Sequence, residues 1–237
     1  MSSFEYKITI GVSHIGRDGL LKLGAAADLL QNASWFQMDT EVAIRDYFRQ
    51  HNLGLYLTFR QIDIKRFPAY GETVIAKSWV YNCDRLYGYR NSVIYDSEGR
   101  FCIASVGMGA FVDLARGLPT RLPQEILDSS IRYEPLDMEV LSRKIPLPHA
   151  MTVIGEPFKV QSYHLDNYGH MNNARYLDIA SAYLPDDFTL RRLRIEYKRP
   201  ALPGETIIPQ AGTRDDKLVI ALTSPDKAIF ASVEFQS

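Results

Sequence analysis

The sequence predicts an α+β protein that contains two copies of one unit, each a long helix wrapped by antiparallel strands of one continuous sheet. An internal repeat is the first observation behind this prediction. Residues 62–75 and residues 195–208 are identical at seven of 14 positions, and residues 13–19 share a histidine and a glycine, in the same order, with residues 163–169. The second observation is that both copies continue with helical periodicity and then with β-type runs.

We expect the first unit to cover residues 1–114. Leu23, Ala26 and Leu30 recur at three- and four-residue steps, which predicts a long helix. A second helix is expected at residues 40–52, where an acidic residue stands in the first turn and an Asn-x-Gly ends the pattern. Runs rich in β-branched and aromatic residues predict the strands, which are residues 55–59, 73–80, 87–95 and 101–112, with a hairpin turn at residues 96–99.

The second unit is expected at residues 157–237 and repeats this order. Asn172, Tyr176 and Tyr183 stand at helical spacing, and Pro185 stops the predicted helix. The predicted strands are residues 190–197, 206–211, 218–223 and 228–235. The second unit has no room for a counterpart of the additional helix.

The segment between the units, residues 115–156, is rich in proline and has little periodicity. It is predicted to be a linker that crosses from one unit to the other, with a short helix near residues 124–128.

Composition excludes several functional classes. Lys and Arg number 27 against 28 Asp and Glu, so the chain lacks the basic excess typical of nucleic-acid binding. Cys83 and Cys102 have no metal-ligand spacing, and no nucleotide-binding glycine motif is present, so no cofactor or metal is expected. The sequence shows neither a signal-peptide pattern nor a run of ~20 apolar residues, so we expect a cytoplasmic protein without membrane insertion.

The strongest chemical signal is the run of residues 166–173, directly before the second helix. It holds one acid, one imidazole and three amides in eight positions. A glycine followed by a helix start exposes backbone N–H groups that can hold a developing oxyanion. Asp166 and His170 are then in reach of the same point. The alternative is that the acid and the asparagines only cap the helix.

The internal repeat favours the chemical interpretation. The first copy has Gly16 where the second has Asp166, and Leu20 where the second has His170. The first helix therefore starts without this acid and imidazole, so capping does not require them. We expect one unit to carry the site and the other to shape a pocket.

The whole chain, close to residues 5–235, resembles the acyl-(acyl carrier protein) thioesterases, a double hotdog family of plant plastids and many bacteria. The matching features are residues 21–23, residues 30–31, Trp79 with residues 87–91, residues 104–113 followed by residues 118–123, residues 166–173, and Tyr176. The resemblance implies a tandem hotdog fold. It also implies hydrolysis of acyl thioesters on acyl carrier protein, which releases free fatty acid and ends chain elongation.

The family motif Asp-x-Asn-x-His-x-Asn-Asn places the site residues on this sequence. Its aspartate falls on Asp166, its histidine on His170 and its last amides on Asn172 and Asn173, whereas its first asparagine falls on Tyr168. We expect Tyr168, Gly169, Asn172 and Asn173 to contact the substrate. Beyond the Tyr-Lys-Arg run at residues 197–199, where the family tends to carry an acid and sometimes a cysteine, the chain has Pro200 and Ala201.

These departures shape the expected mechanism. Ala201 excludes a thiol nucleophile at its position, so direct attack of water on the thioester is favoured. His170 would be the general base, with Asp166 orienting the imidazole or the water; the reverse assignment, with Asp166 as the base, stays open. Backbone N–H groups near Gly169 and His170 would polarise the carbonyl. Tyr168 would either donate a hydrogen bond in place of the asparagine or simply line the pocket.

Two further features bear on the substrate. An apolar tunnel for the acyl chain is expected along residues 24–27 with Trp35, Phe36 and Met38, with ordinary core packing as the alternative. The basic cluster, defined as Arg191, Arg192, Arg194, Lys198 and Arg199, is a candidate docking surface for acidic acyl carrier protein.

Two alternative functions stay open. One is hydrolysis of acyl-coenzyme A, which carries the same phosphopantetheine arm. The other is binding of acyl thioesters without cleavage. One chain is sufficient for the hotdog pair, and a homodimer is the alternative state.

Overall fold

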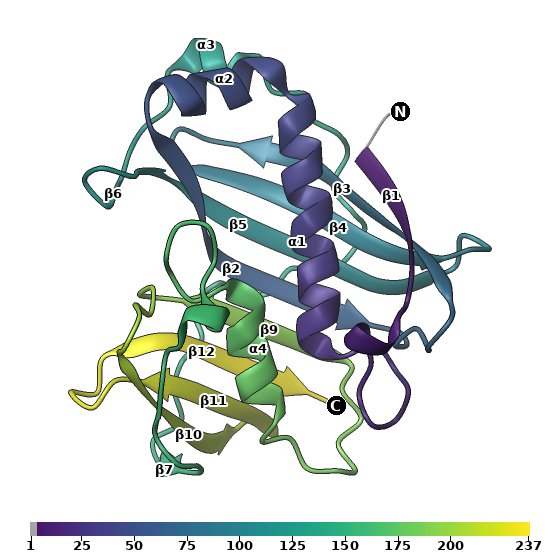
Figure 1. Cartoon of the computed structure of the whole chain (residues 1–237), viewed down its shortest axis with the longest axis vertical. Helices are drawn as coiled ribbons and strands as arrows, with labels where there is room; N and C mark the ends of the chain where they lie inside the picture. The colour runs from purple at the N-terminus through teal and green to yellow at the C-terminus, as the bar shows by residue number, and fades with distance from the viewer. Residues whose placement is uncertain (1–3) are drawn as a thin grey trace.

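The computed structural model describes residues 4–237 and shows one antiparallel sheet of 12 strands. Helices α1 (Leu23–Thr40) and α4 (Asn173–Ser181) lie on one face of this sheet (Figure 1). The strand order is β1-β3-β4-β5-β2-β9-β12-β11-β10-β7, with β6 beside β5 and β8 beside β10. The strands are β1 (Phe4–Thr9), β2 (Leu53–Ile64), β3 (Thr73–Cys83), β4 (Tyr87–Asp96), β5 (Phe101–Asp113), β6 (Leu118–Pro119), β7 (Thr152–Val153), β8 (Phe158–Lys159), β9 (Arg192–Tyr197), β10 (Thr206–Arg214), β11 (Lys217–Thr223) and β12 (Ile229–Gln236). The prediction of two helices wrapped by one continuous sheet is confirmed.

The first unit forms the longer elements. Helix α1 (Leu23–Thr40) buries Leu23, Ala26 and Leu30 against β1, β3 and β4, as their spacing predicts. Helix α2 (Val42–Gln50) follows at the expected place. The predicted strands and hairpin turn are present, and β1 is the strand that the expected unit order of strand, long helix and antiparallel strands places before α1.

The second unit has a shorter helix than the sequence pattern indicates. Helix α4 (Asn173–Ser181) ends before Tyr183, whose N–H already donates to Ala180 O at 3.2 Å in a turn. The four predicted strands correspond to β9, β10, β11 and β12. Among the described residues, no counterpart of α2 follows α4, as expected.

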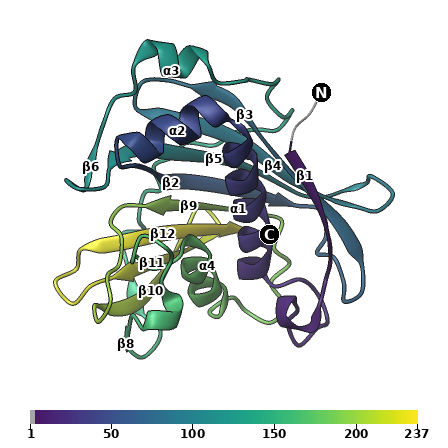
Figure 2. The same cartoon turned by 45° about the horizontal axis from the view of Figure 1, so that its top comes forward.

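The two units meet at two places. Strands β2 and β9 pair from Phe59 with Glu196 to Asp63 with Arg192, which makes the sheet continuous. Helices α1 and α4 pack side by side over this seam (Figure 2). Their side chains form one large core that draws buried residues from both units.

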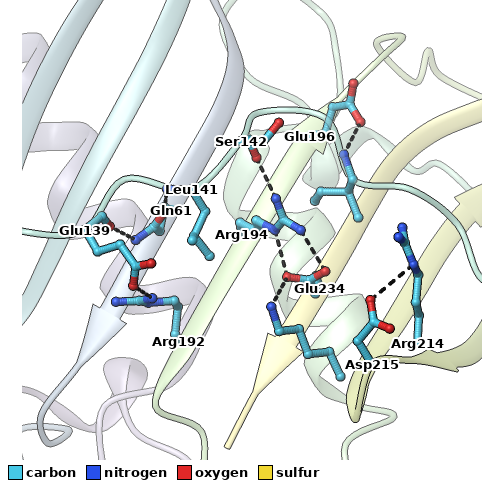
Figure 3. Close-up of polar contacts among 12 residues, drawn as sticks. Gln61, Glu139, Leu141, Ser142, Arg192, Arg194, Glu196, Arg214, Asp215 and Glu234 are labelled. Atoms are coloured by element: carbon cyan, nitrogen blue, oxygen red, sulfur yellow. Dashed lines mark hydrogen bonds and ion pairs between the residues drawn. The ribbon is translucent and has the colours of Figure 1, made fainter.

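The later part of the linker, residues 134–145, runs over the sheet face opposite the helices, whereas its first part packs against α2. Gln61 alternates with Arg60, whose guanidinium reaches Ala27 O on α1, so Gln61 points to the far face. There Gln61 Nε2 donates to Glu139 O at 2.8 Å and Oε1 accepts from Leu141 N–H at 2.9 Å (Figure 3). Short helix α3 (Gln124–Asp128) lies in the linker where expected. We retain residues 1–114, 115–156 and 157–237 as a proposed division of the chain.

No helix within residues 4–237 is long and apolar enough to cross a membrane.

Candidate active site

The same turn precedes the helix in both units. The turns are η1 (Val12–His14) and η2 (Ser162–His164). In the first, Nδ1 of His14 accepts from Gly11 N–H at 3.0 Å, and in the second, Nδ1 of His164 accepts from Gln161 N–H at 3.1 Å. The repeated histidine is therefore a structural residue that closes the turn. Burial, followed by the charge of Arg175, lowers the pKa of His164.

The loop after each turn also has one backbone conformation. Gly16 N–H donates to Leu20 O at 2.8 Å, and Asp166 N–H donates to His170 O at 2.7 Å. The shared glycine has φ +75° in the first loop and +76°, at Gly169, in the second. Such angles are strained for any residue with a Cβ, which explains why both copies keep glycine there. The loop forms around Gly16 and Leu20 as well as around Asp166 and His170.

Asp166 fixes the second loop with its side chain. Its Oδ1 accepts hydrogen bonds from Tyr168 N–H at 2.9 Å and from His170 N–H at 3.2 Å. Gly169 N–H donates to Asp166 O at 3.1 Å. The N–H groups of Gly169 and His170 are thus used inside the loop, because the loop closes on itself. This differs from the expectation that they polarise the substrate carbonyl.

The two asparagines have different positions. Asn172 caps α4, because its Oδ1 accepts from Ala174 N–H at 2.9 Å, and it does not line the cavity described below. Asn173 lines the cavity and its Nδ2 donates to Gln31 Oε1 of α1 at 3.4 Å. Tyr197 donates its hydroxyl to Asn173 O at 3.0 Å. Asn173 therefore joins the two units beside the site, whereas Asn172 stabilises the helix start.

Tyr168 and His170 pack against the first unit. The ring of Tyr56 on β2 lies 5.4 Å from that of Tyr168 and 5.3 Å, edge to face, from that of His170. Trp35 lies 6.1 Å from Tyr168 on the other side. Burial raises the pKa of Tyr168 to about 12, although a hydrogen bond with the backbone of Leu55 opposes this shift. Tyr168 is thus a neutral phenol that holds the loop against β2.

These groups surround a cavity of about 190 Å³. It lies between α1, the sheet and the second loop, beside residues 53–58 of β2, which pair with β5 but not with β9. Glycines at 88, 107 and 109 and the side chains of Leu55 and Leu57 form the sheet side of the lining. The cavity lining includes Gln31, Ser34, Trp35, Met38, Tyr56, Arg60, Arg90, Ser92, Asp166, Tyr168, His170, Asn173, Tyr176 and Tyr197.

The expected acyl tunnel is only partly correct. Trp35 and Met38 line the cavity. Phe36 points away and packs at 5.5 to 5.6 Å against Tyr6 and Phe4 instead. Residues 24–27 do not line it, because their turn of α1 packs into the core and against α4.

Four cavity residues were not assigned to the site from the sequence, namely Gln31, Tyr56, Arg60 and Arg90. Gln31 and Arg90 belong to stretches that carry the family resemblance, but no site role was expected for them. The four residues lie on α1, β2 and β4, far from the loop in sequence. An isolated arginine inside a strand of mostly apolar residues was the available signal for two of them.

Ala201, the second residue after the Tyr-Lys-Arg run, cannot contact the substrate. Ala201 is fully buried, and its N–H donates to the hydroxyl of Tyr176 at 2.9 Å while its carbonyl accepts from Met171 N–H at 2.9 Å. Pro200 lines the cavity without supplying a proton donor or acceptor there. Asp166 and His170 therefore remain the candidate site residues on this side of the cavity.

The basic cluster divides into two groups, apart from Arg191, which is exposed and lines the second cavity described below. Arg192 forms an ion pair with Asp63. Arg194 forms a buried, bidentate ion pair with Glu234 and also donates a hydrogen bond to Ser142 O (Figure 3). These two arginines lie under the linker on the face opposite the helices. They fasten the linker and the sheet, so they do not form the expected docking surface.

Lys198 and Arg199 make up the second group. Both are exposed and line the cavity. Lys198 lies 3.6 Å from Glu196, and Arg199 lies 3.1 Å from Glu205. Because both cations are exposed to solvent, these ion pairs are weak and leave the positive charges accessible to a partner. The positive charge available for a partner is thus beside the site.

A second cavity occupies the equivalent place in the other unit. It is lined by the first loop, by residues 65–67, which match residues 198–200 in the repeat, and by Asp178 and Ser181 of α4. Gly16 and Leu20 stand there in place of Asp166 and His170. Only one of the two related cavities therefore has the acid and the imidazole.

Two fused helix-in-sheet units in one continuous sheet, with one acid–imidazole loop facing a cavity, form a double hotdog protein with a candidate active site. The chain belongs to the acyl-ACP thioesterase family. The family's N-terminal domain matches residues 1–130 and its C-terminal domain matches residues 150–224. The chain is accordingly a hydrolase of acyl-ACP thioesters.

Solved structures share the fold over the whole chain. An acyl-ACP thioesterase from Bacteroides thetaiotaomicron is 19% identical with a TM-score of 0.81, covering 98% of this chain and 96% of its own. The 12:0-ACP thioesterase from Umbellularia californica is 14% identical with a TM-score of 0.84, with the same coverage of 98% and 96%. None of the curated proteins matches the sequence.

Proposed function

We propose that the chain releases free fatty acid from acyl-ACP, and so ends chain elongation, by attack of water on the thioester at the second loop. The observation that carries this proposal is the cavity itself. Asp166 and His170 line it, and the apolar side chains of Trp35, Met38, Leu55 and Leu57 around the same space suit an acyl chain.

Asp166 is proposed as the general base and His170 as the hydrogen-bond donor to the thioester carbonyl. Two backbone hydrogen bonds hold Asp166 at Oδ1, which leaves Oδ2 for a water molecule. The ring of His170 is positioned by Tyr56 rather than by a hydrogen bond that it donates to Asp166. This geometry favours two independent roles over an imidazole oriented by the carboxylate.

The substrate partner is proposed to be acyl carrier protein, in the cytoplasm, with one chain forming the complete site. Lys198 and Arg199 support the choice of an acidic partner, because they place positive charge beside the cavity. Coenzyme A thioesters are the alternative substrates. A homodimer is not needed, because both units contribute to the cavity within one chain.

The experiment is thiol release from matched acyl-ACP and acyl-CoA substrates by the wild type, Asp166→Asn and His170→Gln, across pH. We expect Asp166→Asn to lower kcat/KM by at least a hundredfold, because general base catalysis contributes roughly 10²–10⁴-fold. His170→Gln keeps a donor and should lose less.

The pH profile separates the two assignments. An imidazole base in ordinary surroundings titrates near pH ~6.5 and a carboxylate near ~4. If His170→Gln abolishes a limb near neutral pH while Asp166→Asn retains it, the base is the histidine and our assignment is wrong. Binding of acyl thioesters without release of thiol would mean that the chain is a binding protein.

A further inference from the structure

The inner end of the cavity holds two arginines in one row across the sheet. Arg60 on β2 and Arg90 on β4 both stand opposite Gly107 on β5. Residues opposite each other in antiparallel strands point to the same face. That face is the helix face, because Arg60 Nη1 donates to Ala27 O of α1 at 3.3 Å. Gly107 adds no side chain of its own between these two positions, and the nearest side-chain atom above it is Leu57 Cδ1.

Both arginines have N–H groups without a partner. Arg60 is 6% exposed and its Nε is buried with no hydrogen bond, and Nη1 of Arg90 is buried in the same way. A Cβ placed on Gly107 would lie 3.5 Å from Leu57 Cδ1 and 3.9 Å from Arg60 Nε, so this nitrogen lies beside the Leu57 side chain above the glycine. Buried polar groups of a native protein are almost always paired, and an unpaired one needs an explanation.

The charge of the cavity is also unbalanced. Its lining has four cationic side chains, Arg60, Arg90, Lys198 and Arg199, but one carboxylate, Asp166. Within residues 4–237, no ion pair joins Arg60 or Arg90 to an acid. The two carboxylates whose charges act on these arginines are themselves bonded to other residues.

Those acids are Asp28 and Glu41. Asp28 pairs with Arg175, and Glu41 accepts hydrogen bonds from Gln37 and Ser130. Burial lowers the pKa of Arg90 to about 10, with Glu41 opposing the shift, and burial also lowers the pKa of Arg60. The charged guanidinium groups are therefore incompletely stabilised by the protein alone.

The neighbouring hydroxyl groups do not change this balance. The hydroxyl groups of Ser34, Ser78 and Ser92 lie 3.0 to 3.2 Å from one another and form hydrogen bonds among themselves. Ser34 and Ser78 also donate to backbone carbonyl groups. An unsubstituted acyl chain would place only methylene groups against the free N–H groups and leave them unpaired. A carboxylate would accept from both arginines, because guanidinium donors and carboxylate acceptors form strong charge-assisted hydrogen bonds.

We propose that Arg60 and Arg90 bind a carboxylate at the far end of the acyl chain, so that the enzyme prefers thioesters of dicarboxylic acids to those of unsubstituted fatty acids. This inference rests on the proposed function and specifies its substrate. The thioester lies at Asp166 and His170, and the chain extends under α1 across β2 and β5. The length of chain that spans this distance sets which dicarboxylic acid fits.

The test compares three series of acyl-ACP substrates of equal length. They are the unsubstituted butanoyl to decanoyl thioesters, the same chains with a terminal hydroxyl group, and the monothioesters of succinate, adipate, suberate and sebacate. We expect one dicarboxylic substrate to exceed its unsubstituted partner at least tenfold in kcat/KM. Arg90→Met should reduce this ratio at least tenfold by lowering activity on the dicarboxylic substrate and raising it on the unsubstituted one.

Two variants keep the test decisive. Arg60→Met should act in the same direction as Arg90→Met, and Arg90→Met alone is sufficient if loss of the Ala27 contact unfolds the Arg60 variant. Arg85→Met is the control, because Arg85 is an exposed arginine just before β4 that does not line the cavity. It should leave the ratio unchanged.

The outcomes distinguish this inference from the proposed function. If unsubstituted chains are hydrolysed at least as well as dicarboxylic ones, the carboxylate proposal is wrong and the thioesterase proposal stands. Equal preference for the terminal hydroxyl group would also overturn it, in favour of a neutral ligand. If no thioester of any series is hydrolysed, the proposed function fails instead.

Discussion

At the scale of single residues, His14 and His164 show that a repeated histidine need not be chemical. Both rings accept a backbone hydrogen bond in a turn, whereas His170 has no counterpart in the first unit. The repeat separates structural residues from candidate site residues, because a residue present in both copies supports the fold that both copies share.

The partly buried ring of His164 predicts a pH dependence of stability. Its pKa is lowered in the folded protein by burial and then by Arg175. The unfolded chain therefore binds a proton below about pH 6.5 that the folded protein resists, so the free energy of unfolding falls as the pH falls through this range. His164→Asn keeps an acceptor near Nδ1 and removes the titration. We expect its melting temperature to fall less than that of the wild type between pH 8 and pH 5.5.

His14→Asn calibrates this measurement at pH 8, because it changes the same kind of turn hydrogen bond in the other unit. An equal loss of melting temperature at low pH in wild type and His164→Asn would show that His164 does not cause the dependence.

At the scale of elements, helices α1 and α4 are held together by polar contacts at three levels. Gln31 meets Asn173, Asp28 meets Arg175, and Gly24 lies against Asp178. Positions rise on one helix as they fall on the other, so the helices are antiparallel. Asp178 accepts a backbone hydrogen bond from Gly24, which satisfies one N–H at the start of α1.

Gly24→Ala tests this contact by the sign of its effect. In an ordinary helix, alanine is about 1 kcal/mol more favourable than glycine. Here a Cβ would overlap the Asp178 carboxylate, so we expect the free energy of unfolding to fall by about 1–3 kcal/mol. Urea denaturation of both single variants and of the double variant with Asp178→Ala measures the coupling.

In the Asp178→Ala background, Gly24→Ala should be neutral or stabilising, since the obstacle is gone. A stabilising effect of Gly24→Ala in the wild-type background would mean that α4 moves away at little cost.

The elements were predictable to the extent that they depend on local sequence. Periodicity indicated α1, and the repeat indicated that one loop precedes both helices, because the loop is closed by hydrogen bonds between residues near in sequence. The cavity was not predictable in this way. Arg60 and Arg90 become neighbours through strand pairings with β5, and Asn172 and Asn173 differ in role only because α1 lies beside one of them.

At the scale of the whole molecule, Lys198 and Arg199 place exposed positive charge directly beside the cavity, which suits an acidic partner. The chain is nearly neutral, with a formal charge of -1, and the arginines on the face opposite the helices are used in ion pairs with the sheet and linker. The exposed cations beside the cavity remain. An acidic carrier protein would be steered to that surface.

Lys198→Glu should therefore raise KM for acyl-ACP by roughly threefold to tenfold at low salt, with a smaller effect at high salt. The internal repeat supplies a matched control. Lys65 is the equivalent exposed lysine beside the second cavity, and Lys65→Glu should leave KM unchanged. Equal effects of the two variants would place docking elsewhere, and an unchanged salt dependence in Lys198→Glu would exclude steering by this lysine.

The second cavity has a consequence for how such a molecule can diversify. In a symmetric pair of identical subunits, every substitution that adjusts one cavity is imposed on the other, and both must continue to work. Fusion of the units in one chain removes this obligation. The first loop keeps the turn, the glycine and the helix start that the fold needs. Gly16 and Leu20, which replace the acid and the imidazole there, have no side chain that could take part in the reaction. One unit is then free to become a specificity domain, and substrate range can change without placing the acid–imidazole loop at risk.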